Sequence, residues 1–286
     1  MRMAMYMQGW VLTMVLSKGI FLYWGKNQKE KIKMETGFEK LSRLRDKKGS
    51  SLIFGADPSN IKTLDLVAPY VVGVKPNLAF YEATESERKR MMELMQHARS
   101  KGLVTILDAK RGDILDTQKK WAEADIKNFN PDIVTLHSFS GQDAVQPYLD
   151  LDPQICAYIM GAMSNQSAQI QNLVTVEGLR VYQHIALDAH EWGNGRVGLV
   201  VGSTQSKAAS DIRSIEQARV PGNEPLQFLS PGFGKQGGSL EFVSIAGQSA
   251  VYPISSGLTS EKHLKGKTPA EAAKQWRDDI NAELGL

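Results

Sequence analysis

The segment Asp108–Asp113 places two carboxylates and an ammonium within six residues, directly after the apolar run Leu103–Leu107. Successive side chains of a strand point to opposite faces, so Asp108 and Lys110 should share one side while Ala109 points away. At the end of an apolar strand both charged groups lose water, and only a paired charge is tolerated there. The spacing predicts an ion pair that belongs to a functional site, with a purely structural salt bridge as the alternative.

Short apolar runs rich in β-forming residues alternate along the chain with amphipathic helical patterns. The expected strands are Ser51–Gly55, Tyr70–Lys75, Leu103–Leu107, Ile133–Leu136, Ile155–Ile159, Val197–Val201, Leu226–Leu229 and Ala250–Ile254, and the expected helices include Glu85–Lys101, Thr117–Phe129, Leu179–Glu191, Ser206–Gln217 and Pro269–Leu284. Strand–helix alternation gives parallel strands, and runs that are apolar on both faces belong in a sheet covered on both sides. The pattern predicts the α/β class and a single-domain (β/α)8 TIM barrel, closed at its bottom by a helix over residues 36–46.

Polar residues that follow the predicted strands are the candidates for function, because such barrels carry their chemistry at the C-terminal ends of the strands. They are Asp57 after the first strand, Lys75 to Asn77 at the second, Asp108 to Asp113 after the third, Ser164 and Asn165 after the fifth, and Ser230 to Gly238 after the seventh. Each alone fits a turn, a cap or a solvated strand end, but their shared location favours a site. The glycines between Gly232 and Gly238 let the backbone approach a ligand closely, and this is the usual phosphate loop of the fold. A phosphorylated ligand is therefore expected, with a merely flexible loop as the alternative.

Composition limits the class of protein. An apolar share of 42% and a charged share of 23% are ordinary for a globular protein, and a net charge of +3 is too weak for a nucleic-acid-binding face. Cys156 is the single cysteine, which excludes an intrachain disulfide or a cysteine metal cluster and fits a reducing cytoplasm. Residues 1–35 differ, since Met5–Trp24 is largely apolar and the basic run Lys26–Lys33 follows. We expect a disordered extension or a spurious start there rather than a membrane anchor, before a domain over residues 36–286.

From about Leu52 to the C-terminus the chain resembles orotidine 5′-phosphate decarboxylases, with the longer bacterial-type branch most similar. The matching segments are Asp57-Pro58, Lys75-Pro76-Asn77 with Ala79-Phe80, Leu107 to Ile114 with Thr117, Ser164-Asn165, Gly198 to Thr204 and Pro231 to Gly238. The resemblance implies decarboxylation of orotidine 5′-phosphate to UMP by a cytoplasmic homodimer that uses no metal, flavin or other cofactor. It implies neither a nucleic-acid nor a membrane partner.

The resemblance also implies roles for individual residues. Lys110 would protonate C6 of the pyrimidine as carbon dioxide leaves, and Asp108 would face the substrate carboxylate. Lys75 and Asp113 would complete an alternating array of lysines and aspartates. The implied substrate-binding residues are Asp57 and Lys75 at the ribose, Ser164 and Asn165 at the pyrimidine edge, Gly234, Lys235 and Gln236 at the phosphate, Ser255 after the eighth strand, and Asp113, Ile114 and Thr117 reaching into the neighbouring subunit's site. His137, Trp192 and Arg213 are expected to be packing or surface residues.

The segment after the eighth predicted strand departs from the family pattern. Relatives carry an arginine there that holds the phosphate through two parallel hydrogen bonds, whereas this chain has Ser256. At about 1.5–3 kcal/mol for each bond to a charged group, the loss amounts to roughly 3–6 kcal/mol. Lys235, Lys262 or Lys265 would have to replace the charge, although a lysine is a poorer two-point clamp.

Two other functions remain open on the sequence. A magnesium-dependent relative that acts on a sugar phosphate, such as a 3-keto-gulonate-phosphate decarboxylase or a hexulose-phosphate synthase, shares the Asp-x-Lys-x-x-Asp pattern. A non-catalytic binder of a phosphorylated ligand would explain the missing arginine. Against such a binder, Asp108, Lys110 and Asp113 are all retained, and a binder gains nothing by burying mutually repelling groups.

We predict that Lys235→Ala raises the Michaelis constant for orotidine 5′-phosphate far more than it weakens binding of the unphosphorylated nucleoside. A phosphate contact is lost only in the first case. Steady-state kinetics and a nucleoside binding assay measure the two effects. Equal effects on both ligands would reject a phosphate role for Lys235.

Overall fold

The computed structural model describes residues 4–7, 10–13, 34–233 and 238–286. The chain forms two units, residues 1–34 and residues 35–286. In the first, β1 (Ala4–Met7) and β2 (Trp10–Thr13) pair in antiparallel fashion. Much of the predicted extension over residues 1–35 lies outside the described residues, so its nature stays a prediction. Across the described ranges, the structure contains no helix with the length and apolarity needed to span a bilayer.

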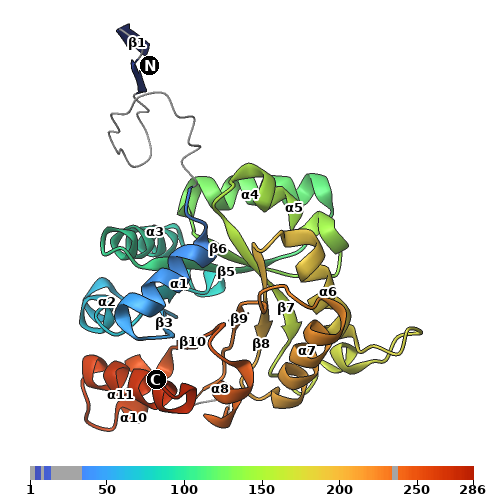
Figure 1. The fold of residues 1–286 in the computed structure, drawn as a ribbon. Helices are drawn as coiled ribbons and strands as arrows, with labels where there is room; N and C mark the ends of the chain where they lie inside the picture. Colours follow the sequence, from blue (N-terminus) through green and yellow to red (C-terminus); the bar gives the residue numbers. More distant parts are fainter. Residues whose placement is uncertain (1–3, 8–9, 14–33, 234–237) are drawn as a thin grey trace. The chain divides into compact units, whose positions relative to one another are not determined.

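Within residues 35–233 and 238–286, eight parallel strands close into a barrel in the order β10-β3-β4-β5-β6-β7-β8-β9 (Figure 1). The strands are β3 (Leu52–Gly55), β4 (Gly73–Lys75), β5 (Val104–Arg111), β6 (Ile133–Leu136), β7 (Cys156–Ala162), β8 (Val197–Val201), β9 (Phe228–Leu229) and β10 (Ala250–Ile254). Each predicted strand is present, and the strands pair in sequence order around the barrel. The predicted TIM barrel is confirmed.

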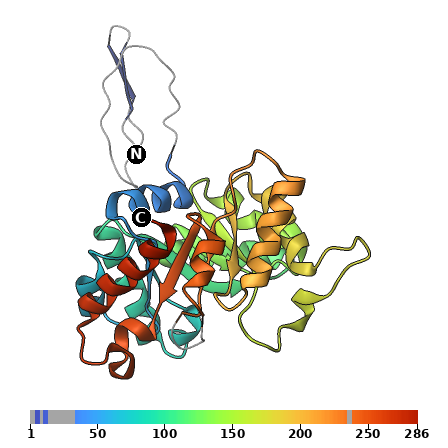
Figure 2. The same cartoon turned by 60° about the horizontal axis from the view of Figure 1, so that its bottom comes forward.

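Helices connect successive strands and cover the outside of the barrel (Figure 2). They are α2 (Ile61–Val67), α3 (Glu85–Ser100), α4 (Leu115–Phe129), α5 (Gln146–Leu151), α6 (Val181–Gly193), α7 (Ser206–Arg219), α8 (Glu241–Ala246), α9 (Ser256–Thr259), α10 (Glu261–Leu264) and α11 (Pro269–Leu284), with the 3-10 turns η1 (Leu78–Phe80), η2 (Gly141–Ala144) and η3 (Gln169–Asn172). The predicted helices are confirmed to within three residues at each end. Their buried faces form one apolar layer against the outer surface of the strands.

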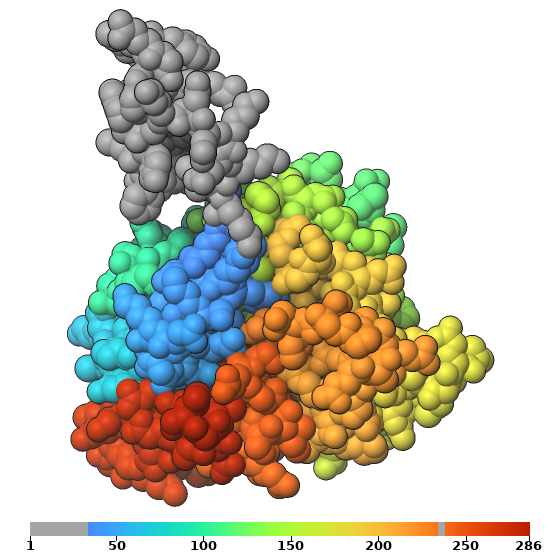
Figure 3. All heavy atoms as spheres, in the orientation of Figure 1, coloured from blue at the N-terminus to red at the C-terminus, as the bar shows by residue number. Residues whose placement is uncertain are grey.

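Helix α1 (Gly37–Lys48) closes the N-terminal end of the barrel. It begins at a capping box in which Thr36 accepts from the backbone N–H of Glu39 and the Glu39 carboxylate accepts from that of Thr36. Phe38 and Leu41 on α1 pack in one buried cluster with side chains that fill the barrel. The helix starts so close to the strands that a Cβ on Gly37 would lie 2.3 Å from a backbone oxygen. Figure 3 shows α1 on the viewed face of the domain. Since α1 covers the N-terminal end of the barrel, the C-terminal end is left for a site.

Candidate active site

A buried carboxylate lies at the C-terminal ends of three neighbouring strands. The Lys75 ammonium at the end of β4 lies 2.5 Å from Oδ2 of Asp108 on β5, and the Lys110 ammonium bonds Oδ1 of the same carboxylate. The Thr135 hydroxyl on β6 donates to that Oδ1 over 2.9 Å. Asp108 and Lys75 are 5% and 6% exposed. The structure therefore confirms the predicted ion pair and extends it to a Lys75–Asp108–Lys110 chain.

The end of β5 is not a regular strand. Its register with β6 shifts between Leu107 and Arg111, and Lys110 has a left-handed backbone with φ of 48°. A lysine adopts this conformation at a cost, which the surrounding contacts must offset. The backbone N–H of Lys110 donates to the Thr135 hydroxyl over 3.1 Å, so one threonine holds both the lysine backbone and the Asp108 carboxylate. Asp108 and Lys110 do share one side, as predicted, but an irregularity of the strand brings them together.

Opposite charges keep Asp108 and Lys75 ionised. Burial raises the pKa of Asp108, but the Lys75 and Lys110 ammonium groups outweigh it and hold that pKa well below its ordinary value. Burial likewise lowers the pKa of Lys75, and the Asp108 and Asp57 carboxylates outweigh it in the opposite direction. The pair is therefore charged at neutral pH without any ligand, and its charges are fixed in position before one binds.

The expectation that both charged groups of β5 lose water is wrong for Lys110. Its side chain is 42% exposed, against 6% for that of Asp108. Lys110 lies within the strand irregularity near the C-terminal end of β5, where its ammonium contacts Asp108 while much of its side chain stays exposed. The predicted array consists of Lys75, Asp108, Lys110 and Asp113, and a single subunit brings only the first three of them together. Among the described residues, the ion-pair chain ends at Lys110, and Asp113 is half-exposed with Oδ1 accepting from the Ile114 N–H over 2.8 Å.

Asp57 and Ser255 lie at the same end of the barrel as the ion-pair chain. Oδ1 of Asp57, after β3, accepts from the backbone N–H of Asn77 over 2.6 Å and so joins the loops that follow β3 and β4. Ser255 follows β10 and lies against the end of β3, where a Cβ on Gly55 would be 2.9 Å from the Ser255 Cβ. The barrel therefore brings residues about 200 positions apart to one rim.

Ser164 and Asn165 follow β7 on the opposite side of this rim. The start of the β7 loop packs so closely on the end of β8 that a Cβ on Gly202 would lie 2.9 Å from the Ser164 Cβ. Ser164 is half-buried, whereas Asn165 is exposed and its amide donates to the Ser167 hydroxyl over 2.9 Å. Ile114 and Thr117 are exposed near the start of α4. The predicted substrate-binding residues in the described part of the chain thus gather around the mouth of the barrel.

The structure describes the expected phosphate loop only up to residue 233 and again from residue 238. Gly234, Lys235 and Gln236 lie outside the described residues, so their roles stay predictions. The backbone N–H of Gly238 donates to the Gly232 oxygen over 3.1 Å, which brings the two ends together. Gly238 lies very close to Ser203, which follows β8. A Cβ on Gly238 would lie 2.0 Å from the Ser203 hydroxyl oxygen. Both ends of the loop are therefore anchored at the same rim.

The segment that replaces the expected arginine is helical. Ser256 begins α9 and is half-buried. Lys262 on α10 and Lys265 just after it are exposed. Replacement of the arginine by one of the lysines stays a prediction.

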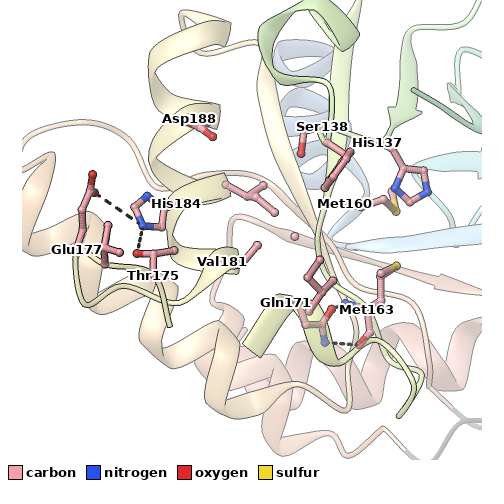
Figure 4. A pocket seen from close by; sticks show the side chains of 15 residues that line it. His137, Ser138, Met160, Met163, Gln171, Thr175, Glu177, Val181, His184 and Asp188 are labelled. Atoms are coloured by element: carbon pink, nitrogen blue, oxygen red, sulfur yellow. Dashed lines mark hydrogen bonds and ion pairs between the residues drawn. The ribbon is translucent and has the colours of Figure 1, made fainter. Parts of the chain in front are cut away.

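A cavity of about 540 Å³ opens between the segment that follows β7 and helix α6 (Figure 4). Met160 and Met163 line its inner end, and Thr175 and His184 line its outer end, where the Thr175 hydroxyl lies 2.7 Å from Nε2 of His184. His137, expected to be a packing or surface residue, lines the cavity as well. Burial, and then the charge of Lys110, lower the pKa of His137. His137 therefore links the cavity to Lys110, while Lys75, Asp108 and Lys110 are not among the residues that line it.

The sequence analysis did not identify Thr135, and it left His137 as a packing or surface residue without placing it beside a cavity. Thr135 is the third residue of β6, and His137 is the first residue after that strand. Threonine is a common strand residue, so its hydroxyl gave no signal of a site. The signal that was available is positional, because polar side chains at the C-terminal end of a barrel strand line the active-site face.

Comparison with known proteins identifies similar chains. The model of the orotidine 5′-phosphate decarboxylase / HUMPS family matches residues 50–251. An orotidine 5′-phosphate decarboxylase of Dehalococcoides mccartyi is 31% identical over 270 residues, which cover 85% of this chain and 96% of that protein. One from an Azoarcus species is 34% identical over 230 residues, which cover 77% of this chain and 82% of the relative.

Two solved structures have a fold similar to that of this chain. The OMP decarboxylase of Leishmania donovani superposes with a TM-score of 0.74 at 28% identity, covering 88% of this chain and all of that one (100%). The UMP synthase of the same organism has a TM-score of 0.76 at 30% identity, covering 88% of this chain and 57% of the longer protein.

Replacing Asp108 by asparagine should lower the free energy of unfolding at pH 7 by about 3–5 kcal/mol, because Lys75 would be buried without its partner. The pKa of Asp108 is lowered on folding from 3.8, so the stability that its charge contributes is present above that value. This contribution is lost as the pH falls through the folded pKa. Urea unfolding between pH 7 and pH 2 should therefore show the gap between wild type and Asp108→Asn narrowing below about pH 4.

Asp116 is the matched control, since it is an exposed aspartate on α4. Asp116→Asn should change stability by less than about 1 kcal/mol. The paired-charge interpretation would be contradicted if Asp108→Asn lowered the free energy of unfolding no more than Asp116→Asn does. A difference from wild type that stays constant down to pH 2 would contradict it as well.

Proposed function

This chain belongs to the orotidine 5′-phosphate decarboxylase / HUMPS family, and we propose that it is a carboxy-lyase that converts orotidine 5′-phosphate to UMP in pyrimidine biosynthesis. The observation that carries the proposal is the Lys75–Asp108–Lys110 chain at the mouth of the barrel. Fixed charges in that order suit a reaction in which a carboxylate leaves and a carbanion must be stabilised and then protonated.

Lys110 is the proposed proton donor. Breaking the bond between C6 and the carboxylate releases carbon dioxide and leaves the electron pair on C6 of the pyrimidine. The Lys110 ammonium stabilises that charge and transfers one proton to C6, which leaves a neutral amine. With 42% of its side chain exposed, Lys110 can take a new proton from water after each turnover.

Asp108 is proposed to face the carboxylate that leaves. Two like charges about 4 Å apart at an effective dielectric constant of 20 repel by about 4 kcal/mol. Relief of that repulsion supplies roughly three powers of ten in rate. The larger share of the barrier lowering comes from the preorganised positive charge of Lys110 and from phosphate binding energy. Lys75 keeps Asp108 ionised, and Thr135 keeps it oriented.

The remaining roles follow from positions around the rim. Asp57 and Lys75 are proposed to bind the ribose hydroxyls, because Asp57 joins the loops after β3 and β4 beside the ion-pair chain. Ser164 and Asn165 are proposed to bind the pyrimidine edge from the β7 loop. Gly234, Lys235 and Gln236, with Ser255, are proposed to bind the phosphate, since both ends of that loop are anchored at the rim.

We include a homodimer in the proposal, with Asp113, Ile114 and Thr117 contributed across the interface. Large apolar side chains are exposed where strands end at the barrel mouth, with Ile114 at 65%, Leu115 at 50% and Phe139 at 94%. Exposed apolar surface of this kind marks an interaction site. Asp113 forms no ion pair with any other residue that the structure describes, which suits a role in a neighbouring site.

The proposed enzyme works in the cytoplasm on a small molecule, with neither a nucleic-acid nor a membrane partner and without a cofactor. Turnover that is insensitive to a chelator supports this reaction over that of a magnesium-dependent sugar-phosphate relative. Turnover that a chelator abolishes and magnesium restores would favour the relative.

Lys110→Ala should reduce turnover of orotidine 5′-phosphate by a factor of about 10⁴ or more, because both the proton and the charge that stabilises the carbanion are lost. Loss of substrate absorbance measures the rate, with and without chelator. UMP affinity should change little, which shows that the variant is folded. A variant that retains more than about one hundredth of the activity would contradict the role of Lys110.

A mixture of two inactive variants tests the shared site. Lys110→Ala and Asp113→Ala should each be nearly inactive alone. If each site takes Lys110 from one subunit and Asp113 from its partner, subunit exchange creates heterodimers in which one of two sites is intact. Random exchange should then restore about a quarter of wild-type activity, since half of the dimers are mixed. Absence of any recovery in a mixture whose exchange is verified by mass spectrometry would contradict the shared site.

A further inference from the structure

A second buried carboxylate lies outside the barrel, behind the end of β5. Asp125 on α4 is 1% exposed, and the Tyr148 hydroxyl on α5 donates to its Oδ2 over 2.7 Å. Nε of Arg111 lies 3.6 Å from the same oxygen. Burial raises the pKa of Asp125, while the Tyr148 hydroxyl and the Arg111 guanidinium act in the opposite direction.

Arg111 is held on three sides. Its guanidinium carbon lies 3.8 Å from the centre of the Trp121 ring on α4, and a terminal nitrogen lies 3.3 Å from Oε1 of Glu82 after η1. With Asp125 as the third partner, the Arg111 side chain is 16% exposed. A planar guanidinium that stacks on an indole, hydrogen-bonds one carboxylate and forms an ion pair with another is fixed in both orientation and position. We call Arg111, Trp121, Asp125 and Tyr148 the Arg111 clamp.

Arg111 directly follows Lys110, the proposed proton donor, in the sequence. The Arg111 carbonyl accepts from the His137 N–H over 2.6 Å, which fastens the strand again directly after the irregularity at Lys110. Lys110 is therefore fixed from two sides, by the Thr135 hydroxyl toward the barrel interior and by Arg111 toward α4. Since Lys110 has a left-handed backbone, release of either anchor lets it relax toward an ordinary strand conformation.

We propose that Arg111 is a positioning residue for the decarboxylation: its clamp to Trp121 and Asp125 fixes the Lys110 backbone so that the ammonium stays against Asp108 and in line with the reacting carbon. The proposal rests on the proposed function of this site. Arg111 acts through Lys110, because its own contacts are with α4 and Glu82. Misplacement of a reacting group by about 1 Å can cost a factor of about 100 in rate, so this role predicts a loss in kcat.

The chain contains a matched control at the other end of the barrel. Arg213 on α7 stacks 3.7 Å from the Phe228 ring centre and lies 2.8 Å from the buried carboxylate of Glu216. Its other partners are the Leu226 and Ala246 carbonyls and the Ser249 hydroxyl, which precede β9 and β10 at the N-terminal end of the barrel. Arg213 repeats the chemistry of the Arg111 clamp without touching the end of β5.

The test compares Arg111→Met, Arg111→Lys and Asp125→Asn with Arg213→Met, using kcat, UMP affinity and thermal midpoint. Arg111→Met should lower kcat about 30- to 100-fold with UMP affinity changed less than about threefold. Arg111→Lys, which retains the charge and protects the fold, should be intermediate. Combining Arg111→Met with Asp125→Asn should add little to the loss from either change, because the two residues act as one unit. Arg213→Met should lower the thermal midpoint by a similar amount and leave kcat within about twofold.

Three results would overturn the proposal. One is an equal loss of kcat in Arg111→Met and Arg213→Met, which would mean general destabilisation. Another is a fall in UMP affinity as large as the fall in kcat, which would mean a distorted binding site. The third is wild-type kcat in both Arg111 variants. A wild-type protein that does not turn over orotidine 5′-phosphate would refute the proposed function itself, and that outcome is recognisable before any variant is measured.

Discussion

Burial of the Asp108 carboxylate is the constraint on which the site depends. A charge that is 5% exposed is tolerated only with close partners of opposite sign, and the barrel provides them from two strands. Lys75 reaches it from β4 and Lys110 from farther along β5, while the Thr135 hydroxyl on β6 fills a further hydrogen-bonding position. Three adjacent parallel strands must therefore end at matching heights, and the closed barrel fixes those heights.

The rest of the molecule leaves that end of the barrel available. Helix α1 fills the opposite end with apolar side chains, and the outer helices bury the second face of every strand. The apolar contacts that stabilise the fold therefore lie at the N-terminal end of the barrel and in the layer between strands and outer helices. The rim carries the features that cost stability, namely buried charge, the left-handed backbone of Lys110 and exposed apolar side chains such as Phe139. Such features are usual at sites where function and stability compete.

The sequence predicted the strands, the main helices and the helix at the bottom of the barrel, because alternation of apolar runs with amphipathic patterns reflects burial directly. It also predicted that Asp108 and Lys110 meet. It did not predict how they meet, since strand alternation assumes a regular strand and Lys110 has φ of 48°. The 42% exposure of the Lys110 side chain was missed for the same reason.

Contacts between elements account for the other differences. Thr135 looks like an ordinary strand residue until β5 is placed beside it, and Arg111 looks like a surface residue until α4 and α5 are placed behind it. Neither the partner of Asp125 nor the position of His137 beside Lys110 can be read from spacing along the chain. Pairings of this kind depend on distances in the folded barrel, which sequence patterns do not contain.

The most direct test of the central claim is an NMR titration of the Asp108 side-chain carboxyl carbon in the ligand-free protein, assigned with Asp108→Asn. We expect the signal to remain that of an ionised carboxylate as the pH falls well below 3.8, because the Lys75 and Lys110 ammonium groups hold the charge in place before substrate binds. A carboxyl group that titrates at or above its ordinary pKa would contradict the preformed Lys75–Asp108–Lys110 chain.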